Sequence, residues 1–248
     1  MTAPVFLCPA ASKATVGEPL ALDGAEARHA GTVQRRAAGE VLDLVDGHGR
    51  RARGPIVEVA EGRVTIRVEE VLEDRDPAVT LVQALAKGGR DEQAVESAVE
   101  LGITTVVPWQ ADRSIVQWRG PKAEKARAKW DALALAAMKQ SRRAVLPTVD
   151  PVVTTRGLVA RVREAVAAGE RVLVLHEVAA QPLTSLSWDD ASQPVTFIVG
   201  PEGGVSDDEV AALVDAGAEA VLLGPHVLRA STAGPAGITA LAALRRTW

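Results

Sequence analysis

The chain has 248 residues, of which 47% are hydrophobic and 24% are charged. This composition is typical of a globular protein, and the length suits one large domain or two modest ones. The formal net charge of −4 excludes a strongly basic protein of the kind that binds nucleic acids through its overall charge. Net charge averages over the whole chain, however, and local segments can differ in sign.

The sequence argues against a disulfide framework, a metal site and a membrane-spanning segment. Cys8 is the only cysteine, so we expect neither a disulfide framework nor a cysteine-based zinc site. No apolar run approaches the length of about 18 residues that a membrane-spanning helix needs, and the first residues lack the features of a signal peptide. We therefore expect a cytoplasmic protein without membrane contact. No metal centre is expected either, because the histidines are scattered along the chain: His29, His48, His176 and His226.

Positive charge is concentrated in one segment. Residues 113–143 carry nine Lys and Arg side chains against two acidic ones, a net charge of +7. Such a run is either a solvated helix face or a contact for a polyanion. Trp118 and Trp130 lie within it and would help a nucleic-acid contact by stacking on bases. Composition favours neither reading over the other.

The first 75 residues are predicted to be mostly β-strands. Val and Ile alternate with polar residues on both sides of Glu61-Gly62, which predicts a β-hairpin. Asp46 to Gly49 predicts a turn between a strand at Val41–Val45 and a segment that starts at Arg50. A short helix is predicted over Ala25–Gln34. These elements indicate a small barrel-like module.

Strands and helices alternate after residue 78. A charged string that ends at Asp76 and is closed by Pro77 marks a predicted boundary, which divides the chain into domains 1–75 and 76–248. Alternation of this kind predicts a parallel α/β sheet. Strands are predicted over Val79–Leu85, Ile103–Val107, Arg171–His176, Val195–Val199 and Val221–Leu223. Helices are predicted over Asp91–Leu101, Pro121–Gln140, Gly157–Ala168, Ser206–Ala216 (with a Ser206/Glu209 capping box) and Pro235–Arg245.

Two loops follow predicted strands, at the sheet edge where open α/β folds bind ligands. In the loop Gly200–Gly204, glycines let backbone amides approach a ligand closely. Glu202 and the acidic start of the next helix would repel a pyrophosphate, and no dinucleotide or P-loop fingerprint is present. An uncharged or cationic ligand fits better, although a tight strand-to-helix turn would explain this loop alone. The loop Leu223–Thr232 favours a ligand site, because a turn needs neither its length nor Arg229.

These two loops resemble those of a known family. Gly200-Pro201-Glu202-Gly203-Gly204, followed by Leu223-Gly224-Pro225-x-Val227-Leu228-Arg229, is similar to the RsmE-type 16S ribosomal RNA (uracil-N3)-methyltransferases. These enzymes belong to the SPOUT, or trefoil-knotted, class that uses S-adenosyl-L-methionine (AdoMet). The chain departs from the pattern at Lys139, at His226 and at Ala230-Ser231-Thr232, where many members have Thr-Glu-Thr, so no role of that Glu is carried over. Five other stretches are similar to the family and occur in the same order along the chain as in its members: His29 to Arg35, Asp46-Gly47, Gln83 to Gly88, Glu100 to Gly102 and Ala137 to Arg143.

The resemblance implies a fold, a cofactor and an assembly. It implies an α/β protein with a C-terminal trefoil-knotted SPOUT methyltransferase domain that forms a homodimer, and a small N-terminal PUA-like β-barrel domain that binds RNA. AdoMet carries cationic sulfonium and amino groups, which acidic loops would tolerate. The implied cofactor-binding residues are Leu175, His176, Gly200, Pro201, Glu202, Gly203, Leu223, Gly224, Leu228, Ser231 and Thr232.

Methylation of N3 of a uridine places specific demands on the site. N3 carries a proton that must leave, and negative charge develops on the uracil carbonyl oxygens. Arg229 is the first candidate for binding the anionic base or its phosphate, with an ion pair to Glu202 as the alternative. His176 and His226 are candidate bases, but such residues are more often loop or capping residues, and the proton could leave to water.

Contacts with RNA are predicted from basic and amide side chains. Arg50, Arg51 and Arg53 are further candidates for phosphate contacts, and Arg90 could line the catalytic face. Trp109 could stack on a base or serve as a core residue. We expect that replacing Arg142 and Arg143 weakens RNA binding and flattens its salt dependence. The predicted RNA-binding residues are His29, Arg35, Arg36, Lys87, Gln140, Arg142 and Arg143.

The favoured function is AdoMet-dependent methylation of N3 of a uridine in 16S rRNA of the small ribosomal subunit. Two alternatives remain open: another knotted methyltransferase that acts on a ribose 2′-hydroxyl or a tRNA base, and a non-catalytic ribosome-assembly factor. Calorimetry with AdoMet separates the last from the enzymes, and mass mapping of rRNA separates the enzymes from each other.

Overall fold

The computed structural model describes residues 3–188 and 190–247 and divides the chain into two compact units. The first unit contains the chain up to Asp76 together with Leu135–Leu146, and the second contains Pro77–Ala134 and the chain from Pro147 on. The segment Leu135–Leu146 therefore packs with residues that precede it by 59 positions or more in the chain.

The first unit is built on one sheet of six strands among the described residues. Neighbouring strands run β1-β3-β4-β5-β2, and β6 pairs with β4. The predicted hairpin is confirmed, because Val59 pairs with Val64 across the turn at Glu61-Gly62. The strands are β1 (Val5–Leu7), β2 (Pro19–Asp23), β3 (Val41–Val45), β4 (Arg50–Ala60), β5 (Arg63–Arg67) and β6 (Glu70–Glu73).

The long strand β4 changes partners along its length. Its first half pairs with β3 and β6, and its second half pairs with β5. Gly54 lies at the change of partner, where a Cβ atom would stand 1.8 Å from the carbonyl oxygen of Arg67. Only glycine permits this close approach. The sheet encloses a core that includes Phe6, Leu22 and Ile66, all nearly inaccessible to solvent.

The predicted helix at Ala25–Gln34 is present in two parts. An α-helical turn, α1 (Gly24–Arg28), continues as a π-helical turn, η2 (His29–Val33). Arg35 follows with a left-handed backbone, φ 53°. A short 3₁₀ helix, η1 (Pro9–Lys13), precedes β2. Single π-helical turns are rare and occur frequently at functional sites.

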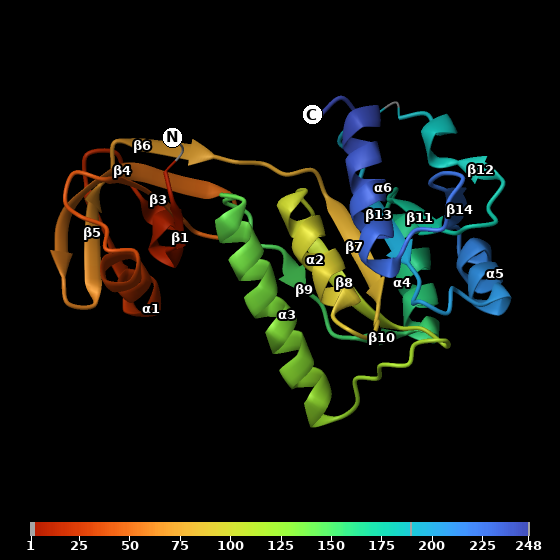
Figure 1. The fold of residues 1–248 in the computed structure, drawn as a ribbon. Coiled ribbons are helices and arrows are strands. Elements are labelled where there is room, and N and C mark those ends of the chain that lie inside the picture. The colour runs from red at the N-terminus through yellow and green to blue at the C-terminus, as the bar shows by residue number, and fades with distance from the viewer. Residues whose placement is uncertain (1–2, 189, 248) are drawn as a thin grey trace. The chain divides into compact units, whose positions relative to one another are not determined.

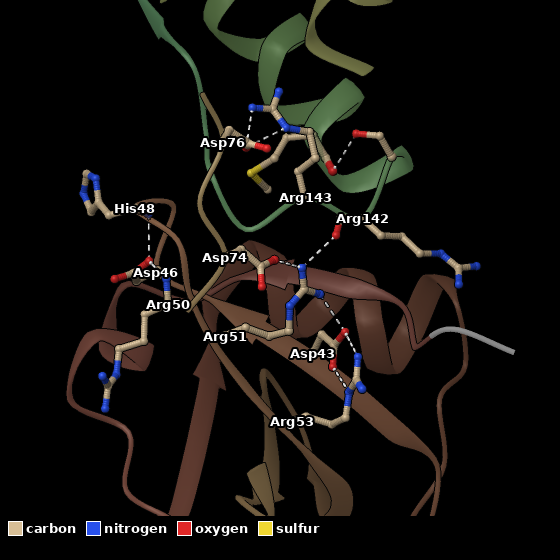
Figure 2. A network of polar contacts seen from close by, with 12 residues as sticks. Asp43, Asp46, His48, Arg50, Arg51, Arg53, Asp74, Asp76, Arg142 and Arg143 are labelled. Atoms are coloured by element: carbon tan, nitrogen blue, oxygen red, sulfur yellow. Dashed lines mark hydrogen bonds and ion pairs between the residues drawn. The ribbon is translucent and has the colours of Figure 1, made fainter. Parts of the chain in front are cut away.

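The end of helix α3 (Pro121–Gln140) belongs to the first unit and stops in a Schellman motif. The N–H of Arg143 donates to the carbonyl of Met138 (3.0 Å), and the N–H of Arg142 donates to that of Lys139 (3.2 Å). Arg142 occupies the left-handed position of the motif, φ 60°, which glycine usually fills. Nη2 of Arg51 donates to the Arg142 carbonyl at 2.9 Å, and the Arg142 side chain points away from that contact (Figure 2).

A buried ion network supports this helix end (Figure 2). Asp43, whose side chain is 2% exposed, accepts from Nη1 of Arg51 at 2.7 Å and from Nε and Nη2 of Arg53 at 2.7 and 2.9 Å. Arg51 also pairs with Asp74. Burial alone would lower the pKa of Arg51, but its hydrogen bonds to Asp74 and Asp43 outweigh burial and raise it. Arg51 and Arg53 are thus committed to carboxylates and are not placed for phosphate.

The second unit is an α/β fold with an entirely parallel sheet, as predicted (Figure 1). Its strand order is β10-β8-β7-β13-β11-β14-β12, and β9 pairs with β8. The strands are β7 (Val79–Ala84), β8 (Thr105–Gln110), β9 (Thr148–Val149), β10 (Val153–Thr154), β11 (Arg171–Leu175), β12 (Gln181–Pro182), β13 (Val195–Val199) and β14 (Glu219–Leu222). The helices are α2 (Arg90–Glu100), the first part of α3, α4 (Thr155–Ala167), the short η3 (Leu183–Ser185), α5 (Asp207–Asp215) and α6 (Ala230–Leu244).

Helices cover both faces of this sheet. Leu158 of α4 and Leu213 of α5 pack with Val82, Val174 and Ile198 in one buried cluster. On the other face, α6 approaches the strands so closely that a Cβ atom on Gly234 would stand 2.9 Å from Leu81 Cδ1. Figure 1 shows α2 beside α6 on that face. Burial on both faces explains why these strands are continuous apolar runs.

Strand β8 does not end before Pro108, contrary to the prediction. The strand continues through Pro108 to Gln110, with Pro108 opposite Gln83 of β7. In a parallel sheet, successive residues of a strand form hydrogen bonds with the neighbouring strand on one side and then on the other. The carbonyl of Val106 accepts from the backbone amide of Asp150, which lies on the β9 side. Pro108 lies two residues further along and faces the same side as Val106. It falls between the last residue of β8 that pairs with β9 and the first that pairs with β10. The sheet therefore does not need the N–H that proline lacks.

Helix α6 begins five residues earlier than predicted, with Arg229 as its N-cap. Pro235 was interpreted as the start because proline favours the first helical turn. The helix instead runs through Pro235, which has no N–H to donate to the carbonyl of Ser231. Ser231 and Thr232 therefore lie in the first turn of α6 and not in the preceding loop.

Candidate functional site

A cavity of about 630 Å³ lies at the carboxyl ends of β11 and β13, within the second unit. This is the sheet edge at which α/β folds bind ligands, and the volume is within the usual range for small-molecule sites. The segment that follows β14 completes its wall. The lining residues are Arg90, Arg113, Leu175, His176, Glu177, Val178, Val199 to Val205, Asp207, Val227 to Ala230 and Ala233.

The structure brings most of the predicted cofactor-binding residues to this cavity. Leu223 and Gly224 line a smaller adjoining cavity of about 70 Å³, which shares Leu175 and Leu228 with the first. Ser231 is buried in α6 and Thr232 is exposed on it, and neither lines a cavity. The predicted residues that line the main cavity are Leu175, His176, Gly200, Pro201, Glu202, Gly203, Leu228 and the candidate catalytic residue Arg229.

The Gly-rich loop between β13 and α5 is held in a tight shape. The predicted capping box is confirmed: Ser206 Oγ accepts from the amide of Glu209, and Glu209 Oε2 accepts from the amide of Ser206 at 3.0 Å. The amide of Gly204 donates to the carbonyl of Pro201 at 2.9 Å. Gly200 has no room for a side chain, since a Cβ atom would lie 2.6 Å from Val205 Cγ2. Contacts within residues 200–209 therefore constrain the loop.

Glu202 is neutralised by α2 and not by Arg229. Its Oε1 accepts from Nη1 of Arg90 at 3.0 Å and from the backbone amide of Lys87 at 3.1 Å. The alternative role considered for Arg229, an ion pair with Glu202, is therefore not observed. Among residues 3–188 and 190–247 the guanidinium of Arg229 makes no hydrogen bond or ion pair, and its side chain is exposed at the cavity.

The two candidate bases differ in position. His176 lines the main cavity, and its backbone amide donates to Val221 at 3.0 Å, which continues the β11–β14 pairing. His226 is exposed and lines only the smaller adjoining cavity. Glu177 and Asp207 also reach the main cavity, so carboxylates and guanidinium groups both face it.

Six of the seven predicted RNA-binding residues lie in the first unit, and Lys87 lies in the second. Arg143 is not placed for phosphate, because its side chain is 9% exposed and pairs with Asp76 at 2.8 Å. Arg36 pairs with Glu40 at 2.9 Å on the surface. His29 lies within hydrogen-bonding distance of Gln34, 3.0 Å. Exposed side chains are those of Arg35, Lys87, Gln140 and Arg142.

The positive segment 113–143 is partly neutralised by contacts distant in the chain. Lys129 pairs with Glu92, and Lys139 pairs with Glu26 at 2.7 Å. Together with the Arg143–Asp76 pair, these contacts take up three of its nine cations. Trp130 is buried against Trp118, with ring centroids 5.0 Å apart, and Trp109 is fully buried. Trp109 and Trp130 are therefore core residues.

Arg90, a candidate for the catalytic face, and Asp207, in the acidic start of the helix after the Gly-rich loop, both line the cavity, whereas Arg113 and Glu177 were not predicted there. Glu177 directly follows the predicted strand Arg171–His176, so adjacency could have signalled it. Arg90 and Arg113 follow β7 and β8, two other strands whose carboxyl ends meet at the same edge. That shared edge was the available signal.

Residues 3–188 and 190–247 contain neither a group of metal ligands nor a membrane-spanning helix. No group of three or more His, Cys, Asp or Glu side chains there could hold a metal ion. No helix in those ranges is long and apolar enough to cross a membrane.

Comparisons with known proteins agree on one family. The family model described as "RNA methyltransferase domain" matches residues 74–244. The ribosomal RNA small subunit methyltransferase E of Mycobacterium bovis is 44% identical over 234 residues, which cover 94% of this chain and 89% of that protein. The enzyme of the same name from Bacillus subtilis is 29% identical, over 86% of this chain and 85% of that protein.

A solved structure extends this similarity to the fold. Ribosomal RNA small subunit methyltransferase E from Neisseria gonorrhoeae, bound to S-adenosyl methionine, has a TM-score of 0.83 and 27% identity, and the match covers 100% of this chain and 98% of that one. A putative methyltransferase from Legionella pneumophila, also in complex with that cofactor, has a TM-score of 0.83 and 28% identity, covering 98% of each chain. The chain therefore belongs to the RNA methyltransferase family, and within it to the RsmE type that its loop motifs resemble.

Proposed function

We propose that this protein transfers a methyl group from AdoMet to N3 of a uridine in 16S rRNA of the small ribosomal subunit. The observation that carries the proposal is the cavity at the carboxyl ends of β11 and β13, which gathers the family's loop residues around one space. Support comes from relatives named ribosomal RNA small subunit methyltransferase E and from a similar structure bound to S-adenosyl methionine.

The residues of the cavity fit AdoMet. Its amino and sulfonium groups are cationic, and Glu177 and Asp207 face the cavity as carboxylates. Its carboxylate and any anionic substrate find the guanidinium group of Arg229. Leu175 and the backbone of the Gly-rich loop offer apolar surface and amides for the adenosine moiety. When bound, AdoMet supplies an electrophilic methyl group at this edge of the sheet.

The chain's own residues would perform the remaining tasks. Arg229 would donate to one uracil carbonyl oxygen, which gains negative charge as N3 loses its proton, and would leave N3 free to accept the methyl group. His176 lies at the cavity and could accept that proton directly or through a water. The tight loop at Gly200 would hold the cofactor in place and so align the two reactants.

The proposal includes a domain organisation and an assembly. We assign residues 1–75 as a PUA-like β-barrel that binds RNA and residues 76–248 as a trefoil-knotted methyltransferase domain that forms a homodimer in the cytoplasm. The exposed apolar side chains Val178, Val227 and Leu228 beside the cavity support dimerisation there, since a second copy would cover them. Light scattering on the purified protein tests the dimer.

Two measurements test the function. Calorimetry should show AdoMet binding, and rRNA from a strain that lacks this protein should lose one methyl group on a uridine base when mapped by mass spectrometry. Absence of AdoMet binding at millimolar concentration would leave only a non-catalytic assembly factor. Loss of a methyl group from a ribose or from tRNA would favour the other knotted methyltransferases.

Replacing Arg142 with Gly should separate RNA binding from stability. A non-glycine residue in the left-handed conformation destabilises the fold by about 1–2 kcal/mol, and glycine removes this cost. About half of the resulting gain in stability is lost, because glycine has a greater conformational entropy in the unfolded state. We expect Arg142→Gly to raise the free energy of unfolding by up to about 1 kcal/mol. We also expect it to weaken RNA binding and to flatten the log–log salt dependence by about 0.7–0.9, one phosphate contact.

Arg246→Gly is the matched control for Arg142→Gly. Arg246 has φ 55° and is also exposed, but it lies at the end of α6. The control removes the same charge and the same backbone strain, so it should gain similar stability in urea denaturation and keep the salt slope. Equal slopes for wild type and Arg142→Gly would contradict the assignment of Arg142.

A further inference from the structure

Arg113 lies against the Gly-rich loop and is outside the stretches in which the chain resembles the family. Its Nη1 donates to the carbonyl of Gly203 at 3.0 Å. The contact is close along the side chain as well: a Cβ atom on Gly203 would lie 3.2 Å from Arg113 Cβ, and one on Gly204 would lie 3.7 Å from Nη1. The arginine thus covers two consecutive glycines at the cavity wall.

The backbone next to Arg113 is anchored to the same region by a buried carboxylate. The amide of Asp112 donates to Oε1 of Glu209 at 2.9 Å, and the hydroxyl of Thr155 donates to the same oxygen at 2.7 Å. Glu209 is 2% exposed, and its other oxygen accepts from the amide of Ser206. Consecutive residues, 112 and 113, therefore bind the two ends of the segment 203–209.

The topology makes this contact informative. In the sheet, β7 separates β8 from β13, so the segment after β8 must pass the end of β7 to reach Gly203. The chain could connect β8 with α3 without passing the end of β7. The exposed guanidinium has no carboxylate partner among the described residues and donates to the Gly203 carbonyl.

We propose that Arg113 is a positioning residue that holds the Gly-rich loop in its ligand-binding shape and thereby sets the affinity for AdoMet. The proposal rests on the proposed function. With the Gly203 carbonyl bound to Arg113 and the Glu202 carboxylate bound to Arg90, two groups of the loop are held before a ligand arrives. A preorganised loop binds its ligand more tightly, because the ordering cost has already been met.

Arg113→Ala should raise the dissociation constant for AdoMet about 10-fold, equivalent to about 1.4 kcal/mol, when measured by calorimetry in the absence of RNA. Because the side chain is exposed and the Asp112–Glu209 bond remains, the melting temperature should stay near that of wild type. Arg113→Lys should recover part of the affinity, since an ammonium can still donate to a carbonyl. Arg163→Ala, an exposed arginine on α4 outside the cavity, is the matched control and should change neither quantity.

A second variant tests the same contact from the loop side. Gly203→Ala adds a methyl group against Arg113 and should displace the loop from it, weakening AdoMet binding. Because both changes break one contact, the double variant should lose less affinity than the two single losses combined. Wild-type affinity in Arg113→Ala, or full additivity in the double variant, would overturn the role of Arg113. Failure of the wild-type protein to bind AdoMet would instead overturn the proposed function.

Discussion

Replacing Asp43 with Ala should lower the free energy of unfolding by about 3–5 kcal/mol, because removing one partner of a buried ion pair leaves a charge without compensation. Asp43 accepts three hydrogen bonds from two arginines, Arg51 and Arg53, and its own side chain is 2% exposed. Loss of the carboxylate would leave Arg51 buried, with Asp74 as its remaining carboxylate partner. Urea denaturation followed by circular dichroism measures the change.

The matched control is Asp23→Ala. Asp23 pairs with Arg63 at 2.7 Å, the same distance as the Asp43–Arg51 pair, but both side chains of the control pair are 57% exposed. Exposed pairs contribute little to stability because solvent screens them. The control should therefore change the unfolding midpoint far less than Asp43→Ala. Equal midpoints for the two variants would show that the buried network does not stabilise the fold.

Arg229→Ala should lower kcat for methyl transfer about 10²–10³-fold, the usual effect of removing one donor that stabilises developing negative charge. Arg229 is exposed at the cavity and, among the described residues, its guanidinium has no partner, so truncation breaks no contact of the fold. We therefore expect an unchanged melting temperature. The measurement is a single-turnover methylation assay with saturating AdoMet and RNA.

Two further variants define what Arg229 does. Arg229→Lys keeps the charge and a donor, so it should recover part of the rate if Arg229 stabilises negative charge on a carbonyl oxygen. Arg163→Ala should retain the wild-type rate. A change confined to KM for RNA, with kcat unchanged, would show that Arg229 binds the RNA backbone and not the reacting base.

Local signals in the sequence predicted the elements of the fold well. Apolar runs such as Val195–Val199 are strands with the predicted bounds, and the Ser206/Glu209 capping box is present. Errors arose where proline was interpreted without its neighbours. Pro108 lies inside β8 because no partner strand needs its N–H. Pro235 lies inside α6. Neither placement can be predicted from the residues next to the proline.

The site was predicted less completely, because its ion pairs join residues far apart in the chain. Glu202 was placed in the cavity correctly, but its partner Arg90 lies 112 residues away and could not be distinguished from Arg229 beforehand. Arg143 was assigned to RNA from local charge, yet Asp76, 67 residues away, holds it. Charge in the sequence indicates which residues can form contacts, and only the fold determines which of them do.

The carboxylate of Glu209 joins three segments through Asp112, Thr155 and Ser206. During synthesis these contacts cannot form until the chain has grown past residue 209, and the cavity wall needs the chain as far as Ala233. A ligand of this cavity therefore binds only chains whose parallel sheet is assembled. By mass action it would favour that population over unfinished or misassembled chains, so the ligand supply in the cell becomes a determinant of how much folded protein accumulates.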